Sequence, residues 1–227
     1  IILKTRINYI IISILLSKYV TLLYNSYGWK IMKQIEITVR LNEDVKVAIK
    51  KLEKLGYKKI RESDIEDIYL TSKLNELNKD NIQYILKKSV LLRKLKLADK
   101  EIKKITYKNK EYDEKGTVIS ESKINLDCSD LEKAEELFKN LDFERLVVVK
   151  YHVIVYSKGT LEYAFQIVEN LGTLIEYENS DDFANKSISD VNNAKEEMYN
   201  QILETGINIT KEKDVKKAYE LIAKSLV

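Results

Sequence analysis

Two glutamates near the end of the strand-rich part of the chain are the residues best suited to chemistry. Glu176 and Glu178 follow the turn at Leu171-Gly172 and alternate with apolar residues. Alternate residues of a β-strand point to one face, so both carboxylates lie on the same side of a strand. An acidic pair on a strand face is costly unless it meets water, a metal ion or basic side chains. The spacing therefore predicts a strand face that meets one of these.

Other segments repeat the alternation with different charges. In 35–41 the polar face carries Glu36, Thr38 and Arg40, and in 118–124 Glu121 pairs with Lys123. Basic residues share a face in three further segments, which contribute Lys150 and His152 (147–153), Lys94 and Lys96 (92–96) and Lys108 (105–108). For any single strand, an antiparallel sheet with one solvated face is the simpler explanation. Several strands of mixed charge favour a closed barrel whose polar lumen could hold a metal-bound polyphosphate.

The order of several short motifs resembles the CYTH superfamily, which includes class IV adenylate cyclases and thiamine triphosphatases. Glu36-x-Thr38-x-Arg40 resembles its opening motif, and Leu171-Gly172 with Glu176-x-Glu178 resembles its closing motif. Smaller matches lie between these motifs and after the closing one, and the resemblance covers Lys33 to about Val227. They are Leu55-Gly56-Tyr57, Asp67-x-Tyr69, Lys94-Leu95-Lys96 (or, in another register, Arg93), Thr106-Tyr107-Lys108 and Ala218-Tyr219-Glu220-Leu221-Ile222.

The resemblance implies an α+β fold, an eight-stranded antiparallel β-barrel (the triphosphate tunnel fold) covered by helices. It implies luminal acids that hold one or two divalent cations, Mg²⁺ or Mn²⁺, and basic residues that hold a triphosphate. The implied metal ligands are Glu36, Glu176, Glu178 and Gln166. The implied phosphate ligands are Arg40, Lys94, Lys96, Lys108, Lys150 and His152.

The chain departs from the family pattern at positions that bear on metal binding. Thr38 replaces the second opening acid, Gln166 stands where the family has Asp, and Lys123 stands where Glu is common. His152 stands where Arg is usual. Magnesium takes hard oxygen ligands, so the three remaining glutamates could bind one ion, whereas Thr38 and Gln166 offer neutral oxygens only. We expect anion binding to survive these changes better than catalysis.

Composition limits the other classes of function. The chain has 227 residues, enough for one core, and its single cysteine, Cys128, permits no internal disulfide, as in a cytoplasmic protein. The formal charge is +3, but residues 1–31 carry four basic and no acidic residues, and the remainder is nearly neutral. The charge therefore gives no reason to expect nucleic-acid binding. No glycine-rich phosphate loop is present.

The first 31 residues do not match the family. Met32-Lys33-Gln34-Ile35-Glu36 would be a natural start, and the apolar run from Tyr9 is interrupted by Ser17-Lys18. We interpret residues 1–31 as an over-extended reading frame, with a membrane anchor as the alternative. Residues 32–227 form the predicted tunnel domain.

Helices are predicted on the outside of the barrel. Apolar stripes predict helices over Glu43–Leu55 and Leu131–Leu141, and residues 71–88 read as a mobile loop or short helix. The tail predicts two helices, Val191–Glu204 and Asp214–Ser225, which pack on the domain, plug the tunnel end or form a homodimer contact. Asp67-x-Tyr69 is interpreted as a turn and packing element.

Three functions fit these observations. The first is a metal-dependent enzyme acting on a triphosphate-containing small molecule (a nucleotide, thiamine triphosphate or polyphosphate), either a hydrolase or an adenylate cyclase. The second is a non-catalytic nucleotide- or polyphosphate-binding protein, because charges are missing from the family's metal set. The third is a partner-binding protein with an empty tunnel.

Overall fold

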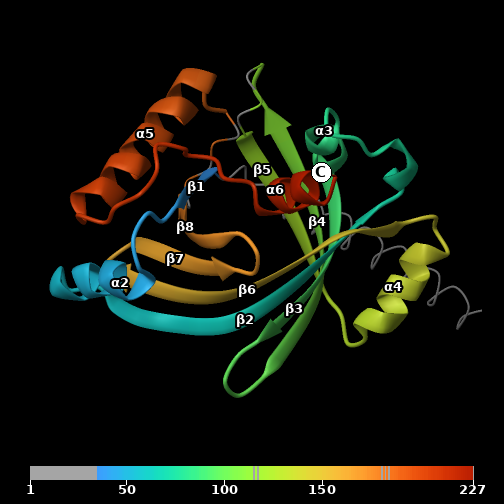
Figure 1. The fold of residues 1–227 in the computed structure, drawn as a ribbon, viewed down its shortest axis with the longest axis horizontal. Coiled ribbons are helices and arrows are strands. Elements are labelled where there is room, and N and C mark those ends of the chain that lie inside the picture. The colour runs from blue at the N-terminus through green and yellow to red at the C-terminus, as the bar shows by residue number, and fades with distance from the viewer. Residues whose placement is uncertain are drawn as a thin grey trace, which may run out of the picture. The chain divides into compact units, whose positions relative to one another are not determined.

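The computed structural model describes residues 35–114, 116, 118–179, 181, 183 and 185–226. They form an α+β domain in which helices surround one curled sheet (Figure 1). The interpretation of residues 1–31 falls outside the described residues. The strands are β1 (Ile35–Arg40), β2 (Lys58–Thr71), β3 (Lys88–Lys96), β4 (Glu101–Tyr112), β5 (Val118–Asp127), β6 (Glu144–Lys158), β7 (Leu161–Val168) and β8 (Gly172–Asn179). The helices are α2 (Val45–Lys54), the 3₁₀ turn η1 (Leu74–Glu76), α3 (Ile82–Leu86), α4 (Leu131–Lys139), α5 (Ile188–Glu204) and α6 (Lys217–Ser225).

The eight strands form one antiparallel sheet in the order β1-β8-β7-β6-β2-β3-β4-β5. This confirms the predicted fold class. The long central strands β2 and β6 pair along almost their whole length, with register shifts at Lys59/Arg61 and Tyr69/Leu70. Such irregularities increase local twist and help a sheet to curl.

The sheet is curled but is not closed by a strand pair between its edges. Among the described residues, no hydrogen-bonded ladder joins β1 to β5. The chain before α6 covers the free edge of β1 instead: the Thr38 backbone N–H donates to the Lys213 carbonyl, and the Val215 N–H donates to the Thr38 carbonyl. The Asp214 carboxylate accepts a hydrogen bond from the Val118 N–H at the start of β5. Residues 213–215 therefore bridge the two edges that a closed barrel would pair.

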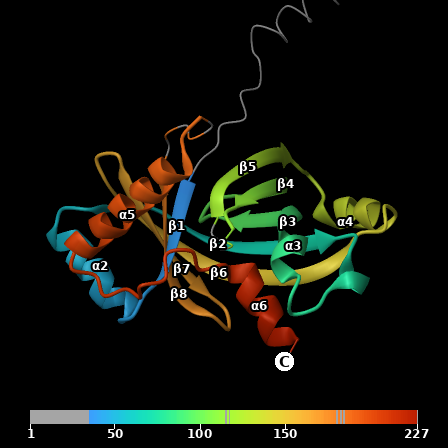
Figure 2. The same ribbon diagram turned by 90° about the horizontal axis from the view of Figure 1, so that it is seen from above.

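The apolar faces of β1 and β8 pack under α2 and α5 on the outside of the sheet, as predicted (Figure 2). The side chain of Asp44 accepts a hydrogen bond from the Lys46 N–H and begins α2, which buries Ala48 and Leu52. A Ser187–Asp190 capping box begins α5, which buries Met198 and Ile202 in the same core. The two predicted tail helices are thus present, and α4 and α3 confirm the predicted helix after Asp130 and the short helix within residues 71–88.

The last helix, α6, has a different position from α2 and α5. It lies beside α3 and against β6, and its residues Ala218 and Ile222 join a second core with Val149, Tyr151 and Val153. Its first turn reaches the concave side of the sheet, where Lys217 lines a cavity. Both tail helices pack on the domain, which is one of the predicted alternatives. In the described part of the chain, no helix has the length and apolar character needed to cross a membrane.

One local prediction is wrong in part. Asp67-x-Tyr69 is predicted to be a turn and packing element, but Asp67 lies inside β2, paired with Arg93 of β3 and Val149 of β6. The packing part of the prediction holds, since only 2% of Asp67 is exposed. A charged aspartate is tolerated at the centre of a sheet because the Arg93 guanidinium meets both of its oxygens.

Candidate functional site

The concave side of the sheet encloses a cavity of about 480 Å³, a size typical of small-molecule sites. Its wall is unusually rich in charge and contains twice as many basic as acidic side chains. The basic ones are Arg61, Arg93, Lys104, Lys108, Lys110, Lys123, Lys216 and Lys217, and the acidic ones are Glu36, Asp67, Glu176 and Glu178. This excess of positive charge favours a polyanionic ligand.

Strand β4 supplies the largest share of this wall. Lys104, Thr106, Lys108 and Lys110 follow one another at every second position, so all point into the cavity. Two of these lysines face another cation on the neighbouring strand: Lys108 pairs with Lys123 of β5, and Lys104 pairs with Arg93 of β3.

Like charges directly opposite each other on neighbouring strands destabilise a sheet. Neither Lys104 nor Arg61 has a carboxylate within 4.0 Å among the described residues. An anion lying near Lys104, Arg61 and Arg93 would be attracted by all three.

A buried carboxylate holds three of the lysines in place. Glu121 of β5 lies 3.2 Å from both the Lys108 and the Lys123 ammonium groups and 3.1 Å from that of Lys110. Burial alone would raise the pKa of Glu121, but the three ammonium groups outweigh it and hold that pKa well below its ordinary value. Glu121 therefore stays charged and organises the cations, as the predicted Glu121–Lys123 pair indicated in part.

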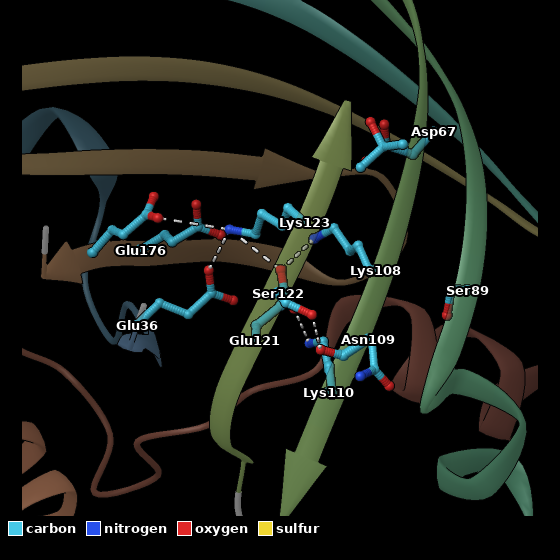
Figure 3. A network of polar contacts seen from close by, with 12 residues as sticks. Glu36, Asp67, Ser89, Lys108, Asn109, Lys110, Glu121, Ser122, Lys123 and Glu176 are labelled. Atoms are coloured by element: carbon cyan, nitrogen blue, oxygen red, sulfur yellow. Dashed lines mark hydrogen bonds and ion pairs between the residues drawn. The ribbon is translucent and has the colours of Figure 1, made fainter. Parts of the chain in front are cut away.

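Lys123 extends from β5 across the cavity to the carboxylates of the opposite wall (Figure 3). Its Nζ lies 3.3 Å from Glu36 Oε2 on β1 and 3.7 Å from Glu178 Oε1 on β8. Burial lowers the pKa of Lys123, but the surrounding glutamates raise it by more than burial lowers it, so the ammonium group stays charged. Burial also raises the pKa of Glu178, and Glu36 and Glu176 add to this, against the opposing effect of Lys123.

The other two predicted metal ligands contact a lysine that sequence reasoning did not single out. Lys217, at the start of α6, donates a hydrogen bond to Gln166 Oε1, and its Nζ lies 3.6 Å from Glu176 Oε2. The same ammonium lies 4.4 Å from the centre of the Tyr151 ring. Burial lowers the pKa of Lys217 more than Glu176 raises it. Burial raises the pKa of Glu176, but Lys217, Lys123 and Lys108 reverse this effect.

Arg93 and Asp67 brace the wall behind these lysines. The Asp67 carboxylate accepts hydrogen bonds from Arg93 Nε and Nη2, each of 2.6 Å, and one of 3.0 Å from the Tyr151 hydroxyl. This bidentate pair fixes β3 against β2 and leaves the guanidinium at the cavity surface, where its side chain is 28% exposed.

The structure divides the predicted phosphate ligands between two faces. Lys108 lines the cavity with all four predicted metal ligands. Lys94, Lys96, Lys150 and His152 instead line a shallower hollow on the opposite face of β3 and β6. Three of them have acidic partners there: Glu101 for Lys94, Glu66 for Lys150, and both Glu62 and Asp64 for His152. Arg40 lies beyond the cavity wall and binds Glu220 of α6 and the Leu171 carbonyl.

The sequence prediction did not include several of the residues that line the cavity. The period of two that begins at Lys108 leads directly to Lys104 and Lys110, and the alternative register of 92–96 leads to Arg93. No comparable signal exists for Lys217, because it comes from a helix that reaches the cavity only after the sheet has curled.

The four predicted metal ligands do not fit a protein-held divalent ion in this arrangement. Magnesium binds its oxygens at about 2.0–2.1 Å, and the ammonium groups of Lys123 and Lys217 contact these same four side chains. Among the described residues, no group of three or more His, Cys, Asp and Glu side chains is placed to hold a metal ion. The predicted Mg²⁺ or Mn²⁺ cofactor stays a prediction.

Comparison with known proteins supports the tunnel architecture. No family model matches the chain. A protein of Methanocaldococcus jannaschii named putative adenylate cyclase MJ0240 is 28% identical over 191 residues, which are 83% of this chain and 97% of that protein. The PH1819 protein of Pyrococcus horikoshii superposes with a TM-score of 0.65 at 20% identity, over 85% of this chain and 99% of its own. HpAC1 of Hippeastrum, a putative adenylyl cyclase described as having a dominant triphosphatase activity, has a TM-score of 0.56 at 15% identity, over 86% and 97% of the two chains.

Proposed function

The chain has the fold of the CYTH superfamily, and we propose that it is an enzyme that binds the triphosphate group of a small molecule in its tunnel and cleaves it. The observation that carries this proposal is the excess of basic side chains around a cavity of about 480 Å³. A triphosphate carries several negative charges along a short chain, which matches a row of cations spaced along a strand.

Three side chains are the best candidates to hold the phosphates. Lys104 and Lys108 are two of the cations of β4, and Arg93 stands opposite Lys104. Lys104 faces Arg93 across the sheet, so a phosphate bound between them reduces their repulsion as well as forming charge-assisted hydrogen bonds. Glu121 and Asp67 would keep the cations oriented before the ligand arrives, which reduces the cost of binding.

Phosphoryl transfer needs positioning and charge neutralisation more than covalent chemistry from the protein. In a triphosphatase, water attacks the terminal phosphorus and loses a proton, the bond from that phosphorus to the bridging oxygen breaks, and the leaving diphosphate group takes the electron pair. Ammonium and guanidinium groups along the chain would stabilise the charge that develops on that leaving group. A divalent ion, when bound to the phosphates, would neutralise charge on the same oxygens.

Hydrolysis is the first candidate reaction because triphosphatase activity is described for HpAC1, which shares the fold. Adenylate cyclisation is the second, because the relative from M. jannaschii bears that name. The two differ in the attacking group, which is water in one and the ribose 3′-hydroxyl in the other. The homodimer contact, the absence of nucleic-acid binding and the cytoplasmic location stay predictions.

Turnover by the full chain tests the proposal. Release of phosphate and pyrophosphate would be followed from tripolyphosphate, thiamine triphosphate and ATP, each with EDTA, Mg²⁺ or Mn²⁺. We expect release from at least one substrate, and a loss of about tenfold or more in kcat/KM for Lys108→Gln. Lys96→Gln, on the outer face, is the matched control and should keep the parent rate.

The products separate the candidate functions. Phosphate from every active substrate indicates hydrolysis, and pyrophosphate with a cyclic nucleotide from ATP indicates cyclisation. Tripolyphosphate binding without turnover of any substrate would contradict the enzyme and leave the non-catalytic binder. Neither turnover nor binding would favour the partner-binding protein.

A further inference from the structure

The four side chains at the family's metal positions are all engaged by two lysines of the same chain. Glu36 and Glu178 lie 3.3 and 3.7 Å from Lys123 Nζ, whereas Glu176 lies 3.6 Å from Lys217 Nζ. Gln166 accepts a hydrogen bond from Lys217. We propose that these two ammonium groups take the place of a protein-held divalent cation, so that the tunnel binds phosphates without a resident metal ion. This inference rests on the proposed function.

The two lysines come from different elements and together contact all four side chains at the family's metal positions. Lys123 comes from β5, which is one edge of the sheet, and reaches Glu36 on β1, which is the other edge. Lys217 comes from α6 and reaches β7 and β8. An ion shared by three or four oxygens would need to lie where these ammonium groups already contact the oxygens.

The charges also favour lysine over a metal at this wall. Glu121, buried beside Lys123, adds one more carboxylate to the cluster, and Lys108 and Lys110 add two more cations. A divalent ion placed at this wall would meet strong like-charge repulsion at short range from Lys108, Lys110, Lys123 and Lys217. The neutral side chains at Thr38 and Gln166 weaken the remaining attraction, since neither contributes a negative charge.

Replacement of the metal ion by two lysines has a consequence for how the substrate binds. Lys123 of β5 stands directly opposite Lys108 of the neighbouring strand β4. The ammonium group that pairs with Glu36 and Glu178 therefore also borders the proposed phosphate site. Any divalent ion in the reaction would then arrive bound to the phosphates rather than to the protein. Tripolyphosphate should therefore bind without Mg²⁺.

Manganese titration of the full chain, without phosphate, tests the inference directly. Free Mn²⁺ gives an electron paramagnetic resonance signal that disappears on binding. We expect the parent protein to leave the signal unchanged, and the double variant K123Q/K217Q to remove about one equivalent, because it frees three glutamates for one ion. Lys216→Gln is the matched control, because Lys216 contacts Gly116, Gln83 and Asp214 and none of the four family positions.

The parent titration decides the matter even when the double variant does not fold. Stoichiometric loss of the Mn²⁺ signal with parent protein would overturn the inference. Calorimetric binding of tripolyphosphate to the parent, in EDTA and in Mg²⁺, adds a second readout: we expect binding in EDTA to be at least as tight as in Mg²⁺, because the free anion carries more negative charge. Binding that EDTA abolishes would also overturn the inference. A parent protein that binds neither Mn²⁺ nor tripolyphosphate keeps the lysine-for-metal assignment and rejects the proposed function, so the two failures are distinguishable.

Discussion

The inner and outer faces of β3 and β6 carry similar residues in opposite surroundings. On the outer face, Lys94, Lys150 and His152 are exposed or half-buried, and each lies beside at least one acidic side chain. On the inner face, Arg93 shares a cavity in which basic side chains outnumber acidic ones, and a buried carboxylate serves three lysines at once. The outer charges thus cancel locally, whereas the inner ones are left in excess.

The difference shows that charge alternation along a strand does not identify the functional face. Exposed ion pairs contribute little to stability and little field beyond their own neighbourhood. Cations that share a buried anion stay charged, and their ammonium groups stay at the cavity wall, where they can attract a ligand. If the comparison is right, equivalent substitutions on the two faces should differ in stability, in pH dependence and in ligand affinity.

Replacing buried Asp67 should have the largest effect on stability. Asp67→Asn leaves the Arg93 guanidinium without its charged partner, and we expect the free energy of unfolding to fall by about 3 kcal/mol in urea titrations. Glu66→Gln, one residue away but on the outer face, breaks the 3.2 Å pair with Lys150 and should cost no more than about 0.5 kcal/mol. Equal losses in the two variants would remove the distinction between the faces.

The acid sensitivity of the protein should depend on Glu121. Its pKa lies below the ordinary value of 4.5 in the folded protein. A carboxyl group with a lowered folded pKa contributes stability that is fully present above the ordinary value and is lost progressively as the pH falls from that value through the lowered folded pKa. We therefore expect the free energy of unfolding of the parent to fall on acidification from about pH 6 to about pH 3, with about 1–3 kcal/mol of the change due to Glu121.

The variant Glu121→Gln isolates this contribution. It should be less stable than the parent at neutral pH but should show a flatter dependence on pH, whereas Glu66→Gln should keep the parent slope. A parental slope in Glu121→Gln would mean that the three lysines do not hold the carboxylate in its charged form.

The smallest expected effect concerns His152 on the outer face. Partial burial lowers its pKa, but hydrogen bonds with Asp64 and Glu62 outweigh this and raise the pKa above the ordinary 6.5. His152 is the single histidine of the chain, so one set of imidazole signals in a proton NMR titration reports it. We expect a midpoint above 6.5 that Asp64→Asn lowers, and tripolyphosphate should not shift it. A midpoint at or below 6.5 would mean that Asp64 and Glu62 do not hold the imidazole in its charged form. A midpoint that tripolyphosphate moves would place the anion site on the outer face.

Most of the fold and part of the site could be predicted from the sequence. Alternation with period two located most of the strands but not β2, and the apolar stripes of 43–55 and 131–141 located helices, because both patterns are local. The same alternation could not say which face of 92–96 or 147–153 would turn inward, since both sides of a curled sheet with a polar interior carry polar residues. In 147–153, Tyr151 and Val153 point into the cavity, and the more polar Lys150 and His152 point out.

Two site features depend on contacts between distant parts of the chain. Asp67 could be placed in a strand only once Arg93, 26 residues later, was known to be its partner. Lys217 reaches Glu176 and Gln166 because the chain before α6 binds along the edge of β1 and carries the helix onto the open side of the sheet. No local pattern encodes either contact.

Calorimetric titration with tripolyphosphate tests the central claim most directly. Two double variants of the full chain each remove two positive charges: K104Q/K108Q in the tunnel and K94Q/K150Q on the outer face. We expect the tunnel variant to lose about 30-fold or more in affinity and the outer variant to stay within about threefold of the parent. Equal losses, or a larger loss in the outer variant, would contradict a triphosphate site in the tunnel.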